Sequence, residues 1–298
     1  MCRLNILVKR KKNVPIDTGL IINFLHANSE NFDSNDDGEG IVVVQEDGTL
    51  FNKSSLDRLH YTDVDITEII TRDNLIIADH TRRATTPIIM DSVQPFRKMV
   101  QGKLLTFMHN GVMSLKGFSN RGKAADEGES DSKFLFNKIC EELIASNIDK
   151  RKNMYDVVKA VFDRYYIRGS FSIFMTYGKD AYYFKNANTS MHSYITSTAL
   201  ILSTSTNMEK FLGEEDINYI KGNISSNTFF WFKHEADGLY QYSIYTRDFV
   251  VSAEPMFHES NAYAGKQYKY QQTVYRNDNK RTVDPWNTSS QRATLWNR

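Results

Sequence analysis

Hydrophobic positions recur with two different periods along the chain. A period of two residues, as in Leu4, Ile6 and Val8, or a short apolar run, predicts a β-strand, whereas a period of three to four residues predicts a helix. The strand patterns cover 3–8, 41–45, 49–53, 75–78, 103–108, 170–176, 181–186 and 195–203. The helix patterns cover 17–27, with Asp17 as N-cap, 132–145 and 154–165. Strands and helices in this order predict two sheets covered by helices.

The pattern changes near Val251. The segment 254–298 is rich in Asn, Gln, Tyr, Ser and Arg and has little apolar period, which predicts an extended arm or a partly disordered segment. Trp286 and Trp296 would allow part of it to dock on the body of the protein or on another subunit. We therefore predict one domain over residues 2–250 and a polar C-terminal extension over residues 251–298.

Composition narrows the class of protein. The 298 residues carry a net charge of +1, which provides no overall field for nucleic acid or a membrane surface. No apolar run approaches the roughly 18 residues of a membrane span, and the start of the chain does not resemble a signal peptide. The basic run 9–12 is interpreted as a solvated strand end. Two cysteines form no disulfide framework, so the sequence predicts a soluble, cytoplasmic protein with free thiols.

Cys2 follows the first methionine. Removal of Met1 would leave one residue with both a thiol and a free α-amino group. The amino group, with a pKa of about 7.7–8.0, could take the thiol proton at neutral pH and so activate the sulfur as a nucleophile. The alternative is that Met-Cys is a chance start without function.

Two polar clusters follow apolar strands. The first, 79–85, contains Arg82, and an arginine at a strand end suits the binding of a carboxylate; the alternative is a surface ion pair. The second, 107–111, ends in Asn110 and Gly111, which could supply the donors of an oxyanion hole. The alternative for the second cluster is an ordinary Asn-Gly turn.

Two more clusters adjoin predicted elements. Asp131, at the start of the helix pattern over 132–145, is either a helix N-cap or a carboxylate aimed at a ligand ammonium. The motif Asp37-Gly-Glu-Gly40 is either a loop that borders a pocket or a connecting turn. The seven histidines show no metal-ligand spacing, and Cys140 lies on the apolar face of a helix as a core residue. We expect no metal and no organic cofactor.

Taken in order, these motifs resemble the class II glutamine amidotransferase domain, which is of the N-terminal-nucleophile (Ntn) hydrolase type. The motifs are Met-Cys, Asp-Gly-x-Gly, His-Thr-Arg-x-Ala-Thr, His-Asn-Gly and Ser-Asp before a helix. The resemblance covers roughly residues 2–215, and the stand-alone members of the family resemble this sequence more than the fused synthases do. It implies an α+β fold, a four-layer αββα sandwich of two antiparallel sheets.

The resemblance also implies a reaction. Cys2 would attack the side-chain amide of L-glutamine, giving a glutamyl thioester and ammonia, while Asn110 and the N–H of Gly111 stabilise the oxyanion. Water would then release glutamate. The ammonia would pass to a separate partner protein or be released, and the sequence leaves this open, together with the formation of a homo-oligomer.

The resemblance assigns substrate contacts as well. Arg82 would hold the α-carboxylate of glutamine and Asp131 its α-ammonium. Thr85 would line the pocket, and His109 of the His-Asn-Gly motif is placed among the substrate-binding residues.

The sequence departs from the family pattern at two notable positions. Gln94 stands where members often have the histidine of Asn-x-His-Pro-Phe, and Glu39 stands where stand-alone members often have tryptophan. Two alternatives to the glutaminase therefore stay open. One is a catalytically silent binding or regulatory subunit on the same fold, and the other is a hydrolase of other γ-glutamyl amides.

Overall fold

The computed structural model describes most of the first 245 residues. The described ranges are 2–11, 13–32, 35–46, 50–59, 61–71, 73–84, 88–114, 130–146, 154–186, 189–205, 208–212, 220–224, 227–235 and 238–245. The chain divides into two units, Met1–Val251 and Ser252–Arg298. The second unit, and with it the predicted C-terminal extension, lies outside the described residues.

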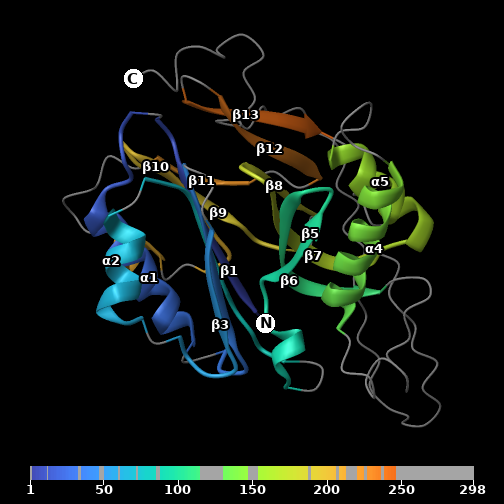
Figure 1. Cartoon of the computed structure of the whole chain (residues 1–298), viewed down its shortest axis with the longest axis horizontal. Coiled ribbons are helices and arrows are strands. Elements are labelled where there is room, and N and C mark those ends of the chain that lie inside the picture. The colour runs from blue at the N-terminus through green and yellow to red at the C-terminus, as the bar shows by residue number, and fades with distance from the viewer. Residues whose placement is uncertain are drawn as a thin grey trace, which may run out of the picture. The chain divides into compact units, whose positions relative to one another are not determined.

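Two antiparallel sheets form the centre of the first unit (Figure 1). The strands of the first sheet are, in spatial order, β11 (Ile220–Asn223), β9 (His192–Ile195), β10 (Ala199–Ser203), β1 (Arg3–Lys9), β4 (Asn74–Thr81), β2 (Glu39–Gln45) and β3 (Leu50–Ser55). Those of the second are β13 (Gly238–Tyr245), β12 (Thr228–Glu235), β8 (Asp180–Lys185), β7 (Arg168–Tyr177), β6 (Lys103–Ser114) and β5 (Phe96–Val100).

Helices cover the outer face of each sheet (Figure 1). The helices are α1 (Thr18–Phe32) and α2 (Asp63–Thr71) on the first sheet, α4 (Asp131–Ser146) and α5 (Met154–Tyr165) on the second, and the short α6 (Met208–Phe211) and η1 (Met90–Ser92). Leu20 and Phe24 of α1 share a buried cluster with Ile77 of β4. Leu135 of α4 shares another with Phe107. The layers therefore run helix, sheet, sheet, helix, which confirms the predicted αββα sandwich.

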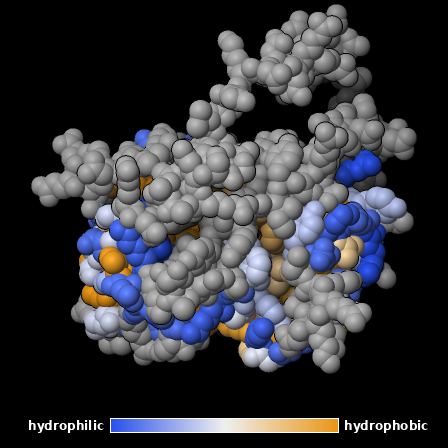
Figure 2. Space-filling view, turned by 90° about the horizontal axis from the view of Figure 1, so that it is seen from above, coloured by the Kyte–Doolittle hydropathy of each residue, from blue (hydrophilic) through white to orange (hydrophobic). Residues whose placement is uncertain are grey.

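Local signals in the sequence are confirmed at the helices. The carboxylate Oδ1 of Asp17 accepts the N–H of Leu20 at 2.9 Å, so Asp17 caps α1 as predicted. Helix α5 has the predicted bounds. On the face that Figure 2 shows, the coloured surface at both sides of the molecule is mostly hydrophilic, with scattered hydrophobic side chains. No helix among the described residues combines the length and apolar character that crossing a bilayer would need.

One predicted strand is wrong. The segment 195–203 is not a single strand but parts of two, β9 and β10. The N–H of Thr196 donates to the carbonyl of Ala199 at 2.9 Å, and the Thr196 hydroxyl accepts the N–H of Ala199. These local bonds reverse the chain in the middle of an apolar run.

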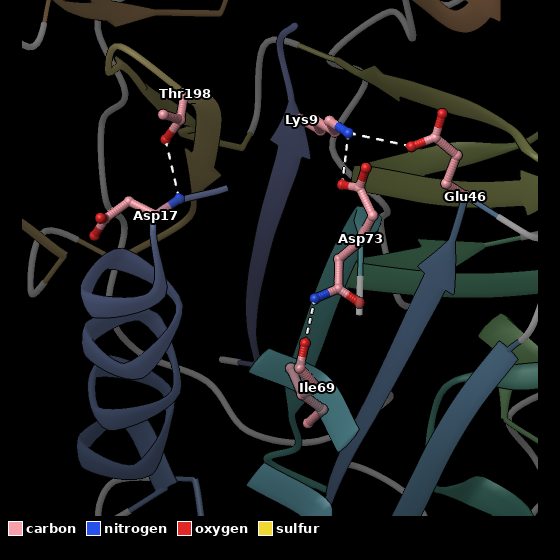
Figure 3. A network of polar contacts seen from close by, with 7 residues as sticks. Lys9, Asp17, Glu46, Ile69, Asp73 and Thr198 are labelled. Carbon is pink, nitrogen blue, oxygen red and sulfur yellow. Dashed lines mark hydrogen bonds and ion pairs between the residues drawn. The ribbon is translucent and has the colours of Figure 1, made fainter. Parts of the chain in front are cut away.

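The interpretation of the run 9–12 as a solvated strand end is wrong for Lys9. Its side chain is only 1% exposed, and its Nζ lies 3.3 Å from Glu46 Oε2 and 2.5 Å from Asp73 Oδ1 (Figure 3). A lysine is buried only when its charge is paired. Lys9 therefore joins the end of β1 to the segments that follow β2 and precede β4.

Gly40 of β2 lies against the Gln94–Pro95 peptide. A Cβ at Gly40 would stand 1.9 Å from the Gln94 carbonyl oxygen and 2.8 Å from Pro95 Cδ. Backbone and ring atoms cannot rotate away, so only glycine fits this approach.

We predict that Gly40→Ala destabilises the fold by on the order of 3 kcal/mol, because the added methyl overpacks a backbone contact. Gly102→Ala is the control. Gly102 has φ of +76°, and a Cβ there would meet no atom within 4 Å. This substitution therefore carries only the backbone cost of about 1–2 kcal/mol. Chemical denaturation measures both free energies of unfolding. Equal losses in the two variants would contradict the close approach.

Glu39 is fully buried beside Gly40. Its Oε2 accepts the N–H of Leu59 at 2.7 Å. Burial raises the pKa of Glu39 from 4.5 to about 7, and the Leu59 N–H and the charge of Arg58 only partly oppose this. Burial and the neighbouring Glu39 also raise the pKa of Asp79 well above its usual value. Each raised pKa favours the neutral carboxyl group.

A carboxyl with a raised folded-state pKa contributes stability at low pH that is lost as pH rises through that pKa. We therefore expect the free energy of unfolding to fall between pH 5 and pH 8, and Glu39→Gln to remove up to about 3 kcal/mol of this loss. Denaturation at both pH values measures the effect. Glu141→Gln, an exposed residue, is the matched control, and a Glu39→Gln profile that parallels it would refute the prediction.

Candidate active site

The register of the first sheet places Cys2 beside the end of β4. Strands β1 and β4 are antiparallel neighbours with Arg3 opposite Thr81, so the residue before β1 meets the residues that follow β4. The backbone N–H of Arg83 donates to the sulfur of Cys2 at 3.4 Å. The thiol in turn lies 3.7 Å from the Arg83 carbonyl oxygen. Cys2 thus lies against the loop that the sequence marked as a carboxylate-binding cluster.

The two arginines of that loop differ in their surroundings. Arg82 is only 5% exposed, and its Nη1 donates to the Asp37 carbonyl at 3.4 Å, whereas the Arg83 side chain is exposed. Burial lowers the pKa of the Arg82 guanidinium, and the nearby Cys2 and Asp37 partly offset this. A surface ion pair, the alternative considered for this cluster, does not describe Arg82.

Two charged candidate residues, Arg82 and Asp131, act electrostatically on the thiol of Cys2. Burial raises the pKa of Cys2, the Arg83 N–H and the charge of Arg82 lower it, and Asp131 raises it. Arg82 and Asp131 have opposite charges and both act on the same sulfur. This arrangement suits a zwitterionic ligand with a carboxylate and an ammonium on one carbon.

Asn110 and Gly111 do not form a turn. Both lie within β6, which continues to Ser114, so the predicted strand end at Met108 and the alternative of an Asn-Gly turn are wrong. Gly111 has φ of +146°, and a Cβ there would stand 2.1 Å from the Ser170 carbonyl oxygen. Asn110 is 2% exposed, and its Oδ1 has no hydrogen-bond partner among the described residues.

Asp131 joins helix α4 to strand β6. The hydroxyl of Ser130 caps the helix by accepting the N–H of Lys133 at 3.1 Å, and Asp131 is the first helical residue. Asp131 Oδ2 accepts the N–H of Met113 at 2.7 Å, and Oδ1 accepts the N–H and the hydroxyl of Ser132 at 2.8 and 3.3 Å. A carboxylate has about four acceptor positions, so these bonds leave capacity for a ligand.

His109 lies beneath the start of α4. It is 1% exposed, its Nδ1 is 2.7 Å from the Ser132 hydroxyl, and burial lowers the pKa of its ring. His109 thereby helps to fix the residue next to Asp131. Thr85, the remaining candidate, lies outside the described residues.

Two polar residues that support this arrangement were not assigned a role from the sequence. The Gln94 side chain accepts the N–H of His109 at 2.5 Å and donates to its carbonyl at 3.3 Å. Asp37 Oδ2 accepts the N–H of Ala84 at 2.7 Å. The sequence marks both positions, since Gln94 replaces a family histidine and Asp37 opens the Asp-Gly-Glu-Gly motif. Neither feature of the sequence indicates which residue the side chain binds.

Across the described ranges, His, Cys, Asp and Glu side chains form no group of three or more that could hold a metal ion.

Solved structures with the same fold are distant in sequence. Glutamine phosphoribosylpyrophosphate amidotransferase from B. subtilis is 14% identical, with a TM-score of 0.53 over 81% of this chain and 49% of that chain. A structure described as the allosteric regulatory enzyme of purine biosynthesis is 15% identical, with a TM-score of 0.51 over 81% and 48%. The chain therefore spans about half the length of these two proteins. At this identity the likeness shows the fold alone.

A third structure, described as a predicted glutamine amidotransferase from Pseudomonas aeruginosa, is 15% identical with a TM-score of 0.42 over 77% of this chain and 95% of that chain. No curated protein sequence matches the chain. The family model for class-II glutamine amidotransferases matches residues 1–199, a span that includes Cys2, Arg82, Asn110 and Asp131. The chain thus belongs to the class II glutamine amidotransferase family.

Proposed function

We propose that this protein is a glutaminase-type amidohydrolase whose nucleophile is the sulfur of Cys2, exposed as the N-terminal residue by removal of Met1. The observation that carries the proposal is the position of the thiol, which accepts the N–H of Arg83 and lies in the field of both Arg82 and Asp131. L-Glutamine has a carboxylate and an ammonium to match these two charges. A silent binding protein would have no need of a thiol at this position.

In the first proposed half-reaction, the α-amino group of Cys2 takes the thiol proton and the sulfur attacks the amide carbon of the glutamine side chain. The carbonyl oxygen becomes an oxyanion that Asn110 and the N–H of Gly111 stabilise. Collapse of this intermediate breaks the C–N bond, and the ammonium of Cys2 returns its proton to the departing ammonia.

In the second half-reaction, water attacks the glutamyl thioester, the α-amino group again takes a proton, and the C–S bond breaks to give glutamate and the free thiol. The ammonia passes to an acceptor protein or is released.

Substrate binding is divided between two segments. Arg82, after β4, would bind the α-carboxylate, and Asp131, at the start of α4, would bind the α-ammonium. Thr85 would line the pocket. For His109 we propose a supporting role, in which its bond to Ser132 holds the start of α4 against β6.

Cys2→Ala should abolish glutaminase activity without loss of fold, because it removes only a sulfur atom. In the unsubstituted protein, 6-diazo-5-oxo-L-norleucine should add once to Cys2, and excess glutamine should block the addition. Intact mass and peptide mapping measure both removal of Met1 and the site of labelling. Cys140→Ala is the control, since Cys140 is fully buried in α4 and its thiol pKa is raised to about 11.

Full activity in Cys2→Ala would refute the mechanism. A protein with Met1 removed that stays unlabelled would favour another γ-glutamyl amide as substrate. Retained Met1 would favour the silent binding subunit.

Asp131→Asn should raise KM for glutamine roughly tenfold to a hundredfold with a smaller effect on kcat, because a hydrogen bond to a charged group is worth about 1.5–3 kcal/mol. Steady-state kinetics measure this, and the thermal midpoint checks that α4 is still formed. Asp91→Asn, which removes an exposed carboxylate paired with Lys133, should leave KM unchanged. A similar KM in both variants would exclude Asp131 as the ammonium partner.

A further inference from the structure

Besides the contact of the Arg82 guanidinium with the Asp37 carbonyl, three hydrogen bonds join the segment Arg82–Ala84 to Asp37 and Gly38. The N–H of Arg82 donates to the Gly38 carbonyl at 2.7 Å, and the N–H of Asp37 donates to the Arg82 carbonyl at 3.2 Å. These two bonds extend the pairing of β2 with β4 by one step beyond the strand ends. The third bond, from the N–H of Ala84 to Asp37 Oδ2 at 2.7 Å, is made by a side chain.

The third bond is placed where the loop leaves the sheet. Arg83 lies between the two anchored residues, Arg82 and Ala84, and its own N–H points at the sulfur of Cys2. Without the bond at Ala84, the peptide units that follow Arg82 could rotate about their soft dihedral angles. The Asp37 carboxylate removes this freedom, because it fixes the N–H of the next residue along.

We propose that Asp37 is a positioning residue of the active site, whose carboxylate binds the N–H of Ala84 and thereby holds the Arg83 N–H on the Cys2 sulfur and the Arg82 guanidinium beside it. The role in turnover rests on the proposed function, whereas the effect on the thiol does not. Asp37 touches neither the sulfur nor the substrate position described above, so it acts through the loop.

The chemistry of the residue fits this role. A carboxylate accepts a backbone N–H more strongly than a neutral oxygen does. The Asp37 charge also stabilises the cationic form of Arg82. Its neighbour Asp36 has the same charge but is exposed, which provides a matched control one residue away.

The experiment measures alkylation of Cys2 by iodoacetamide as a function of pH, with the labelled peptide quantified by mass spectrometry. The loss of the Arg83 N–H should raise the apparent pKa of the thiol by about one pH unit in Asp37→Ala, since this hydrogen bond favours the thiolate. Asp37→Asn keeps an acceptor oxygen and should restore at least half of the shift. Asp36→Ala should match the unsubstituted protein. Far-UV circular dichroism and the thermal midpoint identify any variant that fails to fold.

If Asp37→Ala does not fold, Asp37→Ser replaces it, because serine keeps the turn preference while its hydroxyl is too short to reach Ala84. A pKa shift in the folded variant beyond that of Asp36→Ala supports the proposal. A pH profile that overlays the Asp36→Ala profile overturns it. Because alkylation needs no turnover, a shift seen in a protein without glutaminase activity would uphold the positioning role and reject the proposed function. Where activity is present, KM for glutamine should rise several-fold in Asp37→Ala, in step with displacement of Arg82.

Discussion

The backbone of His109 is a point at which the two sheets are joined. Its carbonyl accepts a hydrogen bond from His80 Nε2 on the first sheet at 3.1 Å, and the Gln94 side chain binds both its N–H and its carbonyl. A carbonyl can only accept, so His80 must carry a proton on Nε2, and in the neutral ring this is the single ring proton. Burial together with the nearby His109 and Arg82 lowers the pKa of His80 to about 3, which keeps the ring in that form. The next residue, Asn110, is therefore held at a fixed distance from the first sheet, which carries Cys2.

The motif Asp37-Gly-Glu-Gly40 contacts three other segments of the chain. Asp37 binds Ala84, the Gly38 carbonyl binds Arg82, Glu39 binds Leu59, and Gly40 admits the Gln94 peptide. The first two bonds position the loop that lies beside Cys2. The close approach at Gly40 positions the Gln94 peptide, and the Gln94 side chain binds the backbone of His109. Alternate residues of a strand face opposite sides of a sheet. Neighbouring residues at the start of β2 can therefore make contacts on the helix-covered face and on the face between the sheets.

Features that depend on neighbours in the chain were predictable, and those that depend on distant partners were not. The cap by Asp17 and the period of α5 are local and were confirmed. Strands β12 and β13 were missed; in β12, Phe229, Phe230 and Phe232 are all buried, and burial on both faces removes the alternation that marks a strand. The pairing of Lys9 with Glu46 and Asp73 spans 37 and 64 residues. The candidate residues were found through the order of motifs, whereas the support given by Asp37 and Gln94 rests on contacts that no motif encodes.

The charges around Cys2 have a consequence for the proposed substrate complex. In the free protein, Arg82 favours the thiolate and Asp131 opposes it. A bound glutamine would neutralise both, since its carboxylate would face Arg82 and its ammonium Asp131. The two effects then largely cancel, and ligand binding also removes water from the sulfur, which raises the thiol pKa further. The contact that still favours the thiolate is the Arg83 N–H, and the α-amino group of Cys2 would add to it once Met1 is removed. The backbone of the Arg82–Ala84 loop therefore matters more to the sulfur in the complex than in the free protein, and this is the segment that Asp37 holds.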